Sequence, residues 1–120
     1  MPCTATAIAF CAALTTGYVV DGDTIRMDDG AYVRLLEIDT PEKGHRAECD
    51  AERMLSVHST ANLERLISGG FTLEPEGRDR YGRILGHLRL PDGRTASEAQ
   101  VSASLGVVYA GRVHDWCGAG

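Results

Sequence analysis

Short runs of β-branched and apolar residues, separated by Asp-Gly pairs, make up the region from residue 18 to residue 38. The runs cover residues 18–20, 24–27 and 31–38, with Asp21-Gly22 and Asp29-Gly30 between them. An Asp-Gly pair between two such runs is a strong hairpin signal, because glycine accepts the positive φ of a tight turn. The pattern predicts three antiparallel strands. Both faces of the third are largely apolar, which favours a position in the middle of a closed sheet.

A helical periodicity follows, from residue 47 to about residue 68. Its apolar residues fall on one stripe and Gly69-Gly70 end it; the stripe consists of Ala51, Met54, Leu55, Ala61 and Leu66. We expect this face of an amphipathic helix to pack on the sheet.

The C-terminal half predicts two more strands and a second helix. Residues 71–74 form a strand, residues 77–82 a polar loop, and residues 83–90 a strand in which Arg83 points away from the core. Thr95 or Ser97 can cap a helix that runs to about Leu105, after which residues 107–109 return to the sheet. Five strands with a helix between the third and fourth predict an α+β fold, a five-stranded Greek-key OB barrel with two packed helices.

Composition limits the domain count and the kinds of partner. The 120 residues are 43% hydrophobic and 24% charged, which is enough for one compact core. The net charge of -5 argues against a protein that coats nucleic acid through a general positive field, so phosphate recognition must be local. No apolar stretch approaches the roughly 18 residues of a transmembrane helix, and we expect a soluble protein with no membrane partner. The first residues make a poor signal peptide, although a secreted or periplasmic location is favoured.

The four cysteines leave the redox state open. Cys3, Cys11, Cys49 and Cys117 allow three disulfide pairings and fit no zinc-binding spacing. We favour a Cys49–Cys117 bridge, because Cys117 lies in a short tail that would otherwise fray and closing so long a loop would add roughly 2–4 kcal/mol. The alternative is four reduced, mostly buried thiols.

Acidic residues beside two arginines carry the most definite chemical signal. Asp21 and Asp23 lie in one turn, Arg34 precedes Asp39 and Glu42, and Arg83 closes the run 79–83. Carboxylates are hard ligands for a divalent cation, and guanidinium groups bind phosphate oxygens. Each signal alone has a structural alternative: a simple turn for the aspartates, a surface or capping role for Glu42, and a buried ion pair for Arg34. For Arg34 we favour function, since a charge buried in an apolar strand is costly.

Three segments, in this order, resemble the signature segments of the thermonuclease family, the staphylococcal nuclease homologues. They are Val-Asp-Gly-Asp-Thr at 20–24, Val-Arg-Leu-Leu-Glu-Ile-Asp-Thr-Pro-Glu at 33–42 and Asp-Arg-Tyr-Gly-Arg at 79–83. The resemblance implies an OB-fold, calcium-dependent endonuclease or exonuclease that cleaves DNA and RNA with low sequence specificity, leaving 5′-hydroxyl and 3′-phosphate ends. It also implies one nuclease domain over residues 1–120, with an N-terminal extension (1–17) and a C-terminal tail (110–120).

The resemblance assigns roles to particular residues. It implies that Asp23, Asp39 and the backbone carbonyl of Thr40 bind one Ca²⁺ ion, for which Mn²⁺ or Mg²⁺ are alternatives. Glu42 would orient or deprotonate the attacking water. The remaining assignments are phosphate binding for Arg34 and Arg83, and substrate binding for Arg80, Tyr81 and Tyr109.

Two functions other than a nuclease are also consistent with these residues. The chain could be a nucleic-acid-binding OB module without cleavage, or a calcium-stabilised interaction domain. The third helix of the family cannot fit after Tyr109, so we expect the tail with Trp116 and Cys117 to cover part of that surface. We expect the protein to be a monomer.

Overall fold

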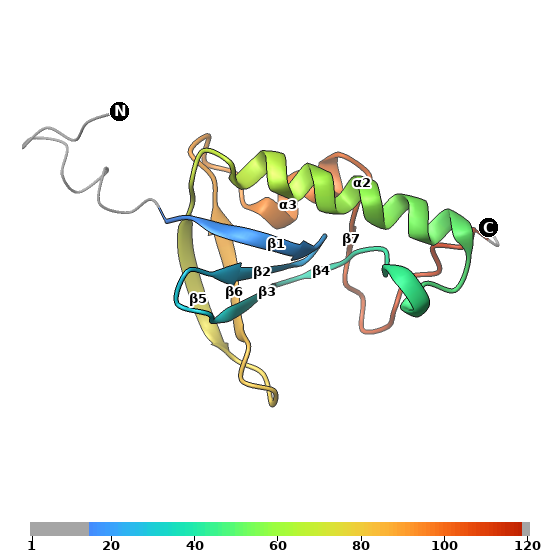
Figure 1. Ribbon diagram of the computed structural model, residues 1–120, viewed down its shortest axis with the longest axis horizontal. Coiled ribbons are helices and arrows are strands. Elements are labelled where there is room, and N and C mark those ends of the chain that lie inside the picture. The colour runs from blue at the N-terminus through green and yellow to red at the C-terminus, as the bar shows by residue number, and fades with distance from the viewer. Residues whose placement is uncertain (1–14, 119–120) are drawn as a thin grey trace, which may run out of the picture.

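A curled five-stranded sheet with two helices on one side forms the body of the protein in the computed structural model, which describes residues 15–118 (Figure 1). The strands are β1 (Gly17–Asp21), β2 (Thr24–Met27), β3 (Tyr32–Leu35), β4 (Ile38–Asp39), β5 (Thr72–Arg78), β6 (Ile84–Arg89) and β7 (Val107–Val108). The helical elements are the 3₁₀ turn η2 (Gly44–Arg46), α2 (Asp50–Ile67) and α3 (Ala96–Ser102). The predicted α+β class and the order of the elements are confirmed. No helix in the described part of the chain is long and apolar enough to cross a membrane.

The strand order in the sheet is β1-β2-β3-β6-β5, with β3 and β6 parallel and the other pairs antiparallel. The outer strands β1 and β5 share no ladder. A single β-bridge joins the residues that precede these two strands. In it, Thr15 and Phe71 exchange backbone hydrogen bonds of 2.6 and 3.0 Å. Pro75 lacks an N–H for a further partner, and a bulge follows it in β5. The prediction of a closed barrel is therefore wrong for the described residues.

The third predicted strand is broken in two by a tight turn at Leu36 and Glu37. Glu37 has a φ of 70°, which is uncommon for a residue other than glycine. Its carbonyl accepts a hydrogen bond from the N–H of Tyr109 at 2.8 Å, and β4 then pairs with β7. The chain thus changes partner, from β6 to β7, within the segment that leads to Asp39. In the C-terminal half, β5 extends to Arg78, so the polar loop is shorter than predicted.

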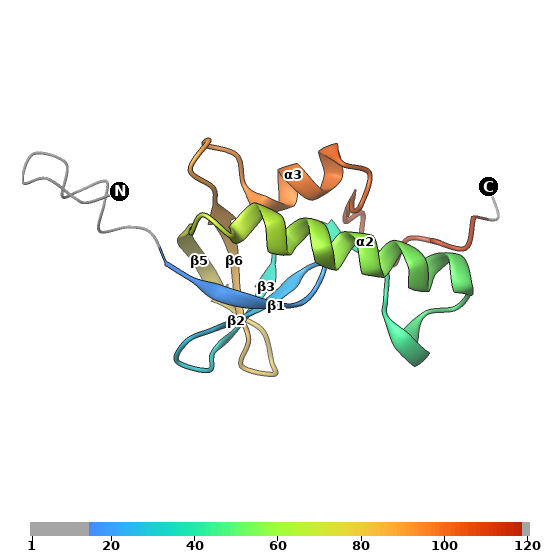
Figure 2. The ribbon, with the colours of Figure 1, turned by 45° about the horizontal axis from the view of Figure 1, so that its top comes forward.

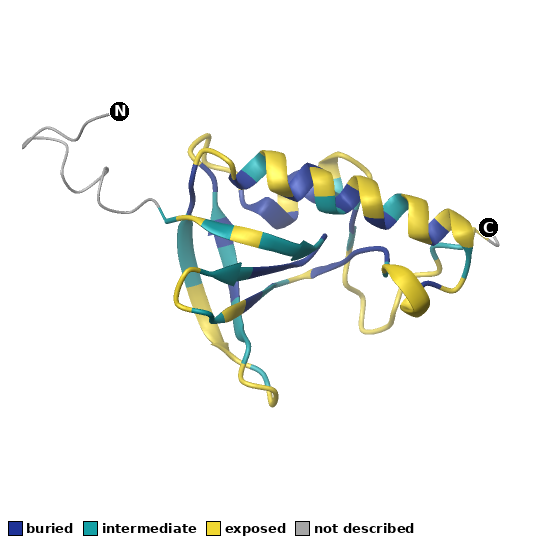
Figure 3. Ribbon diagram, in the orientation of Figure 1, coloured by how far each residue is buried: buried dark blue, intermediate teal, exposed yellow. Residues whose placement is uncertain are grey.

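Helix α2 buries a largely polar face, which contradicts the predicted apolar stripe. Met54 is 60% exposed, and Ala51 and Ala61 are also exposed. The buried residues of α2 are Glu52, Ser56, Ser59, Asn62, Leu63 and Ile67 (Figure 3). Only the last two pack into the apolar core. Glu52 and Ser59 pair with loop backbone, whose N–H and C=O groups need polar partners, and Asn62 donates to the side chain of Gln100 on α3.

The apolar core lies between the sheet and the helices. It includes Ile25, Val33, Leu35, Leu63, Phe71 and Leu88. Figure 2 shows α2 lying across β1, with α3 on the same side of the sheet. Helix α3 begins with a capping box, in which the Thr95 hydroxyl accepts from the N–H of Glu98 and the Glu98 carboxylate accepts from the N–H of Thr95. Thr95, rather than Ser97, is the cap.

The C-terminal segment is anchored at the start of α2. A disulfide joins Cys49, the N-cap of α2, to Cys117, with a Cα–Cα distance of 6.0 Å. The preferred pairing is confirmed, while Cys3 and Cys11 lie outside the described residues. The tail is thereby held next to the loop that carries Glu42.

Candidate functional site

Gly22, in the turn between β1 and β2, packs against helix α2. Gly22 does not have a positive φ, whereas Gly30 in the next hairpin has a φ of 91°. The predicted reason for a glycine is therefore correct at Gly30 and wrong at Gly22. A Cβ atom on Gly22 would lie 2.9 Å from Cβ of Ser59 and would collide with its hydroxyl. Glycine is needed at position 22 because no space remains for a side chain.

Gln100 on α3 connects this turn to both helices. Its side chain is fully buried, and its amide nitrogen donates to the carbonyl of Gly22 at 2.8 Å and to that of Ser59 at 2.9 Å. Its amide oxygen accepts from Asn62 at 2.8 Å. Sequence reasoning missed this residue. The available signal was a polar side chain at a buried position of the predicted second helix.

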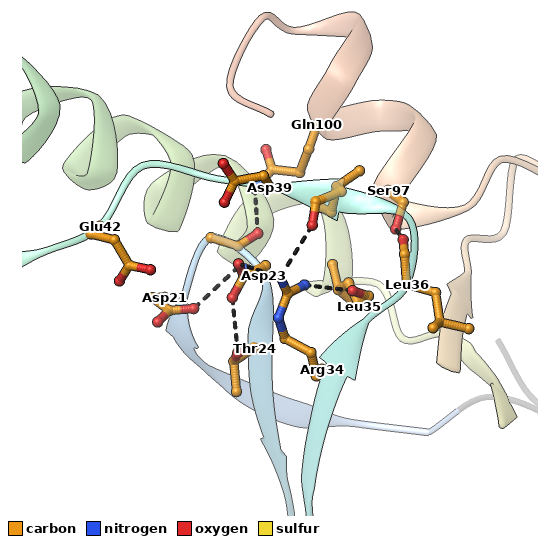
Figure 4. Close-up of polar contacts among 12 residues, drawn as sticks. Asp21, Asp23, Thr24, Arg34, Leu35, Leu36, Asp39, Glu42, Ser97 and Gln100 are labelled. Atoms are coloured by element: carbon orange, nitrogen blue, oxygen red, sulfur yellow. Dashed lines mark hydrogen bonds and ion pairs between the residues drawn. The ribbon is translucent and has the colours of Figure 1, made fainter. Parts of the chain in front are cut away.

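Four carboxylates, Asp21, Asp23, Asp39 and Glu42, gather on one side of Arg34 (Figure 4). The pKa of Asp21 is raised from 3.8 to about 7, first by burial and then by the charge of Asp23. The pKa of Glu42 is also raised, by burial and then by Asp23, with a smaller opposing effect of Arg46. The carboxylates thus raise one another's proton affinity, which is the electrostatic condition that a bound cation relieves. Asp21 was not among the predicted site residues.

Arg34 projects from β3 into this group. Its Nη2 atom lies 3.3 Å from Oδ2 of Asp23. The guanidinium also donates to the carbonyls of Leu35 at 2.6 Å and Ile38 at 3.1 Å, one on each side of the Leu36-Glu37 turn. Arg34 therefore stabilises the turn as well as facing the carboxylates, a structural role that sequence reasoning did not predict.

Arg83 is oriented by Asp79. Its Nε atom donates to Oδ2 of Asp79 at 2.7 Å, and Oδ1 accepts the N–H groups of Tyr81 and Arg83 at 2.9 Å. Partial burial would raise the pKa of Asp79, but these hydrogen bonds lower it below its usual value. Arg34 and Arg83 line the same cleft, of about 270 Å³, together with Tyr109.

Arg80 and Tyr81 lie outside that cleft. The Arg80 guanidinium stacks on the Tyr81 ring at 5.1 Å, and Tyr81 is 72% exposed at the tip of the β5–β6 loop. The structure thus brings Tyr109 to the two arginines and leaves the other two predicted substrate-binding residues on the rim.

Glu52 holds the loop that carries Glu42. This carboxylate is only 4% exposed and accepts the N–H of Glu42 at 2.8 Å and the N–H of Glu48 at 2.9 Å. Glu42 itself lines a cavity of about 460 Å³ with Asp21 and the basic residues Lys43 and Arg46. Sequence reasoning missed Glu52, although a glutamate three residues after the N-cap is a common sign of a helix start.

The C-terminal tail holds Asp39 through a backbone hydrogen bond. The Oδ2 atom of Asp39 accepts the N–H of His114 at 2.7 Å, and Asp39 and Thr40 are both buried. The tail therefore contacts the site directly.

The oxygen donors fit a hard cation with few protein ligands. Among residues 15–118, one group of three His, Cys, Asp or Glu residues has ligand atoms within 4.8 Å of one another, namely Glu48, Asp115 and Cys117. Cys117 is in the disulfide and has no free thiolate. No three of the described site carboxylates meet this spacing, so an ion there would need a backbone carbonyl and waters as its other ligands.

The family model described as "Staphylococcal nuclease homologue" matches residues 32–116. This chain belongs to that family. Within the staphylococcal nuclease homologues, the matched region of this chain includes Arg34, Asp39, Thr40, Glu42 and Arg83, while the Asp21–Asp23 turn lies ahead of it.

Two curated relatives of this staphylococcal nuclease homologue come from Escherichia coli. A protein named "Uncharacterized endonuclease" is 39% identical over 95 residues, which cover 76% of this chain and 57% of the relative. A protein of the same name from Escherichia coli O157:H7 is 38% identical over the same length, with the same coverage. This chain thus spans a little over half the length of the curated relatives it matches.

Proposed function

We propose that this protein is a metal-dependent nuclease that hydrolyses phosphodiester bonds of DNA and RNA with low sequence specificity. The observation that carries the proposal is the placement of Arg34 and Arg83 in one cleft, with the carboxylates of Asp23 and Asp39 beside it. Membership of the nuclease family and the name of the two relatives support it. We assign the sheet to the OB type, with an open seam between β1 and β5. We also propose that the protein is a monomer, since one chain supplies the whole site.

In this proposal Asp23, Asp39 and the carbonyl of Thr40 hold Ca²⁺, and Mn²⁺ or Mg²⁺ can take its place. The ion would neutralise phosphate charge. Arg34 and Arg83 bind the non-bridging phosphate oxygens and stabilise the charge that grows on them, because planar donors held in advance need little reorganisation.

Glu42 acts on the attacking water. Burial and neighbouring carboxylates raise its pKa, which makes it a better proton acceptor than an exposed glutamate. The water oxygen bonds to phosphorus, its proton passes to Glu42, and the bond to the 5′ oxygen breaks as that oxygen takes up a proton from solvent water. The products are a 3′-phosphate and a 5′-hydroxyl.

The main alternative is a nucleic-acid-binding module without cleavage. Such a module has no use for Asp23, Asp39 and Glu42 beside the phosphate-binding arginines, because these carboxylates would repel the ligand unless a cation intervened. The same argument disfavours a calcium-stabilised interaction domain, which would not need the two arginines in one cleft.

Digestion of single-stranded DNA and of RNA tests the proposal. The wild-type protein should cleave both with Ca²⁺ and lose activity in chelator, with Mn²⁺ and Mg²⁺ tested in parallel. Glu42→Gln should reduce the rate by roughly 100-fold or more, while Arg94→Ala, in an exposed pair with Asp92, should leave it unchanged. Binding of DNA without cleavage under all three metals would establish the binding module instead.

A further inference from the structure

Two tyrosines and an arginine form a row across the outer face of the sheet. Tyr18 of β1 pairs in register with Arg26 of β2, which pairs with Tyr32 of β3. Their neighbours Ile25 and Val33 point to the opposite face and are fully buried in the core. Tyr18 is 54% exposed and Tyr32 is 41% exposed, and Figure 3 shows exposed segments on β1 and at the start of β3. Because adjacent strands are about 4.8 Å apart, the Cα atoms of the two tyrosines lie about 10 Å from each other.

Arg26 lies between the two tyrosines in the register of the sheet. Its guanidinium carbon is 5.3 Å from the centre of the Tyr32 ring. Within residues 15–118 it forms no ion pair, and its Nε atom is buried without a hydrogen-bond partner. Because Nε itself is buried, an anion would bind to the terminal Nη groups of the guanidinium.

The row continues into the proposed phosphate-binding cleft. Tyr32 and Arg34 are two residues apart on β3 and therefore share one face, about 6.5 Å from each other along the strand. Beyond the row, on the side away from Arg34, the hairpin turn carries the exposed residues Asp28 and Asp29. Their negative charge would repel a phosphate backbone, which limits the row to a short length of chain.

We infer that Tyr18, Arg26 and Tyr32 form a binding track for a single strand of the nucleic acid substrate, leading away from the scissile phosphate. The inference rests on the proposed function. Two bases stack on the two rings, and Arg26 binds the phosphate between them, which needs no particular base sequence. Bases paired in a duplex have no free face for the rings, so the track selects single-stranded substrate.

A merely structural row of side chains would behave differently. Cross-strand aromatic and cation–π pairs stabilise a sheet by themselves, so alanine variants would lose stability whether or not the row binds a ligand. Affinity for strands of different length separates the two roles, because only a binding track makes the longer strand bind more tightly.

The experiment measures fluorescence anisotropy of labelled oligothymidylates of two and eight nucleotides, with Ca²⁺ and with Glu42→Gln as the background to prevent cleavage. Tyr32→Ala and Tyr18→Ala should each weaken binding of the eight-nucleotide strand by roughly 5- to 100-fold and leave the dinucleotide unchanged. Tyr32→Phe, which keeps the ring, should remain within about twofold of the parent. Met54→Ala, at an exposed position on α2, is the matched control and should have no effect.

The outcomes separate the track from the proposed function. Folded alanine variants that bind the eight-nucleotide strand as tightly as the parent would overturn the track while cleavage by the wild type still stood. Length-dependent binding by a protein that never cleaves would overturn the nuclease and keep the track. If the alanine variants do not fold, photocrosslinking of iodouracil-containing strands to the wild-type protein decides, because crosslinks that avoid residues 17–35 would overturn the track.

Discussion

The backbone N–H of His114 donates a 2.7 Å hydrogen bond to Oδ2 of Asp39, a candidate metal ligand. Three residues later, Cys117 is bonded to Cys49 at the start of α2. The C-terminal tail therefore orients a site carboxylate from a position that the disulfide holds. Any change that frees the tail should affect Asp39 as well as global stability.

Reduction of the disulfide is the first test of this coupling. Opening the Cys49–Cys117 bridge should lower the free energy of unfolding by about 2–4 kcal/mol, because the unfolded chain regains the freedom of a long loop. Calcium affinity measured by calorimetry should fall several-fold, since Asp39 loses its oriented hydrogen bond. Cys117→Ser should show both losses without reductant and should not respond to it. A wild-type melting temperature that reduction leaves unchanged would contradict the stabilising role.

Glu52 should act on catalysis through Glu42. Glu52→Ala leaves the partly buried N–H groups of Glu42 and Glu48 without their acceptor, which should destabilise the protein by about 1–3 kcal/mol. Glu52→Gln retains one acceptor oxygen and should cost less. If Glu52 positions the Glu42 loop, both variants should lower kcat by more than they raise KM, with the loss smaller for Gln. An unchanged kcat in a folded Glu52→Ala variant would show that the loop keeps its position without this carboxylate.

Gly22→Ala should destabilise the fold far more than a substitution in an ordinary surface turn. The added methyl group meets Ser59, so we expect a loss of at least about 2 kcal/mol in a denaturant melt. Ser59→Gly in the same chain should recover part of that loss by removing the colliding atoms. Gly77→Ala is the matched control, because a Cβ there meets nothing within 4 Å. Equal costs at positions 22 and 77 would contradict the steric explanation.

Alanine variants of Arg34 and Arg83 should differ in folding stability, although we expect both arginines to be needed for cleavage. Arg83→Ala removes a half-buried pair with Asp79 at the end of a surface loop and should change stability by about 1 kcal/mol or less. Arg34→Ala removes hydrogen bonds to Leu35 and Ile38 and leaves Asp23 unpaired, so we expect a loss of about 1–3 kcal/mol. Urea denaturation beside a cleavage assay distinguishes the two effects. Equal stabilities for the two variants would refute the structural role of Arg34.

Ionisation of Asp21 should lower the stability of the metal-free protein as pH rises from about 4 to about 7. In this range Asp21 binds more protons in the folded state than in the unfolded state, because its pKa is raised from 3.8 to about 7 on folding. Asp21→Asn removes the buried charge and should raise the free energy of unfolding at pH 8 by on the order of 2 kcal/mol, with little difference below pH 4. Chelator-treated samples melted across this pH range provide the measurement. An Asn variant that is no more stable at pH 8 would show that Asp21 ionises without a penalty.

Local signals in the sequence determined most of the architecture. Asp-Gly pairs located the hairpins, the Thr95 capping box started α3, and the spacing of Arg34, Asp39 and Glu42 marked the site segment. These features depend on residues close together in the chain, whose conformational preferences can be predicted from residue type.

Contacts between distant segments were decided only by the tertiary structure. The apolar periodicity of α2 predicted the core contact of Leu66 but missed the buried polar residues, because these pair with loop backbone and with Gln100 rather than with apolar side chains. Gln100 reaches Gly22 across 78 residues, and His114 reaches Asp39 across 75. The sequence by itself determined which residues could bind a cation and a phosphate. The tertiary structure decided how they are held, because the hydrogen-bond needs of buried backbone are met by partners that no local pattern predicts.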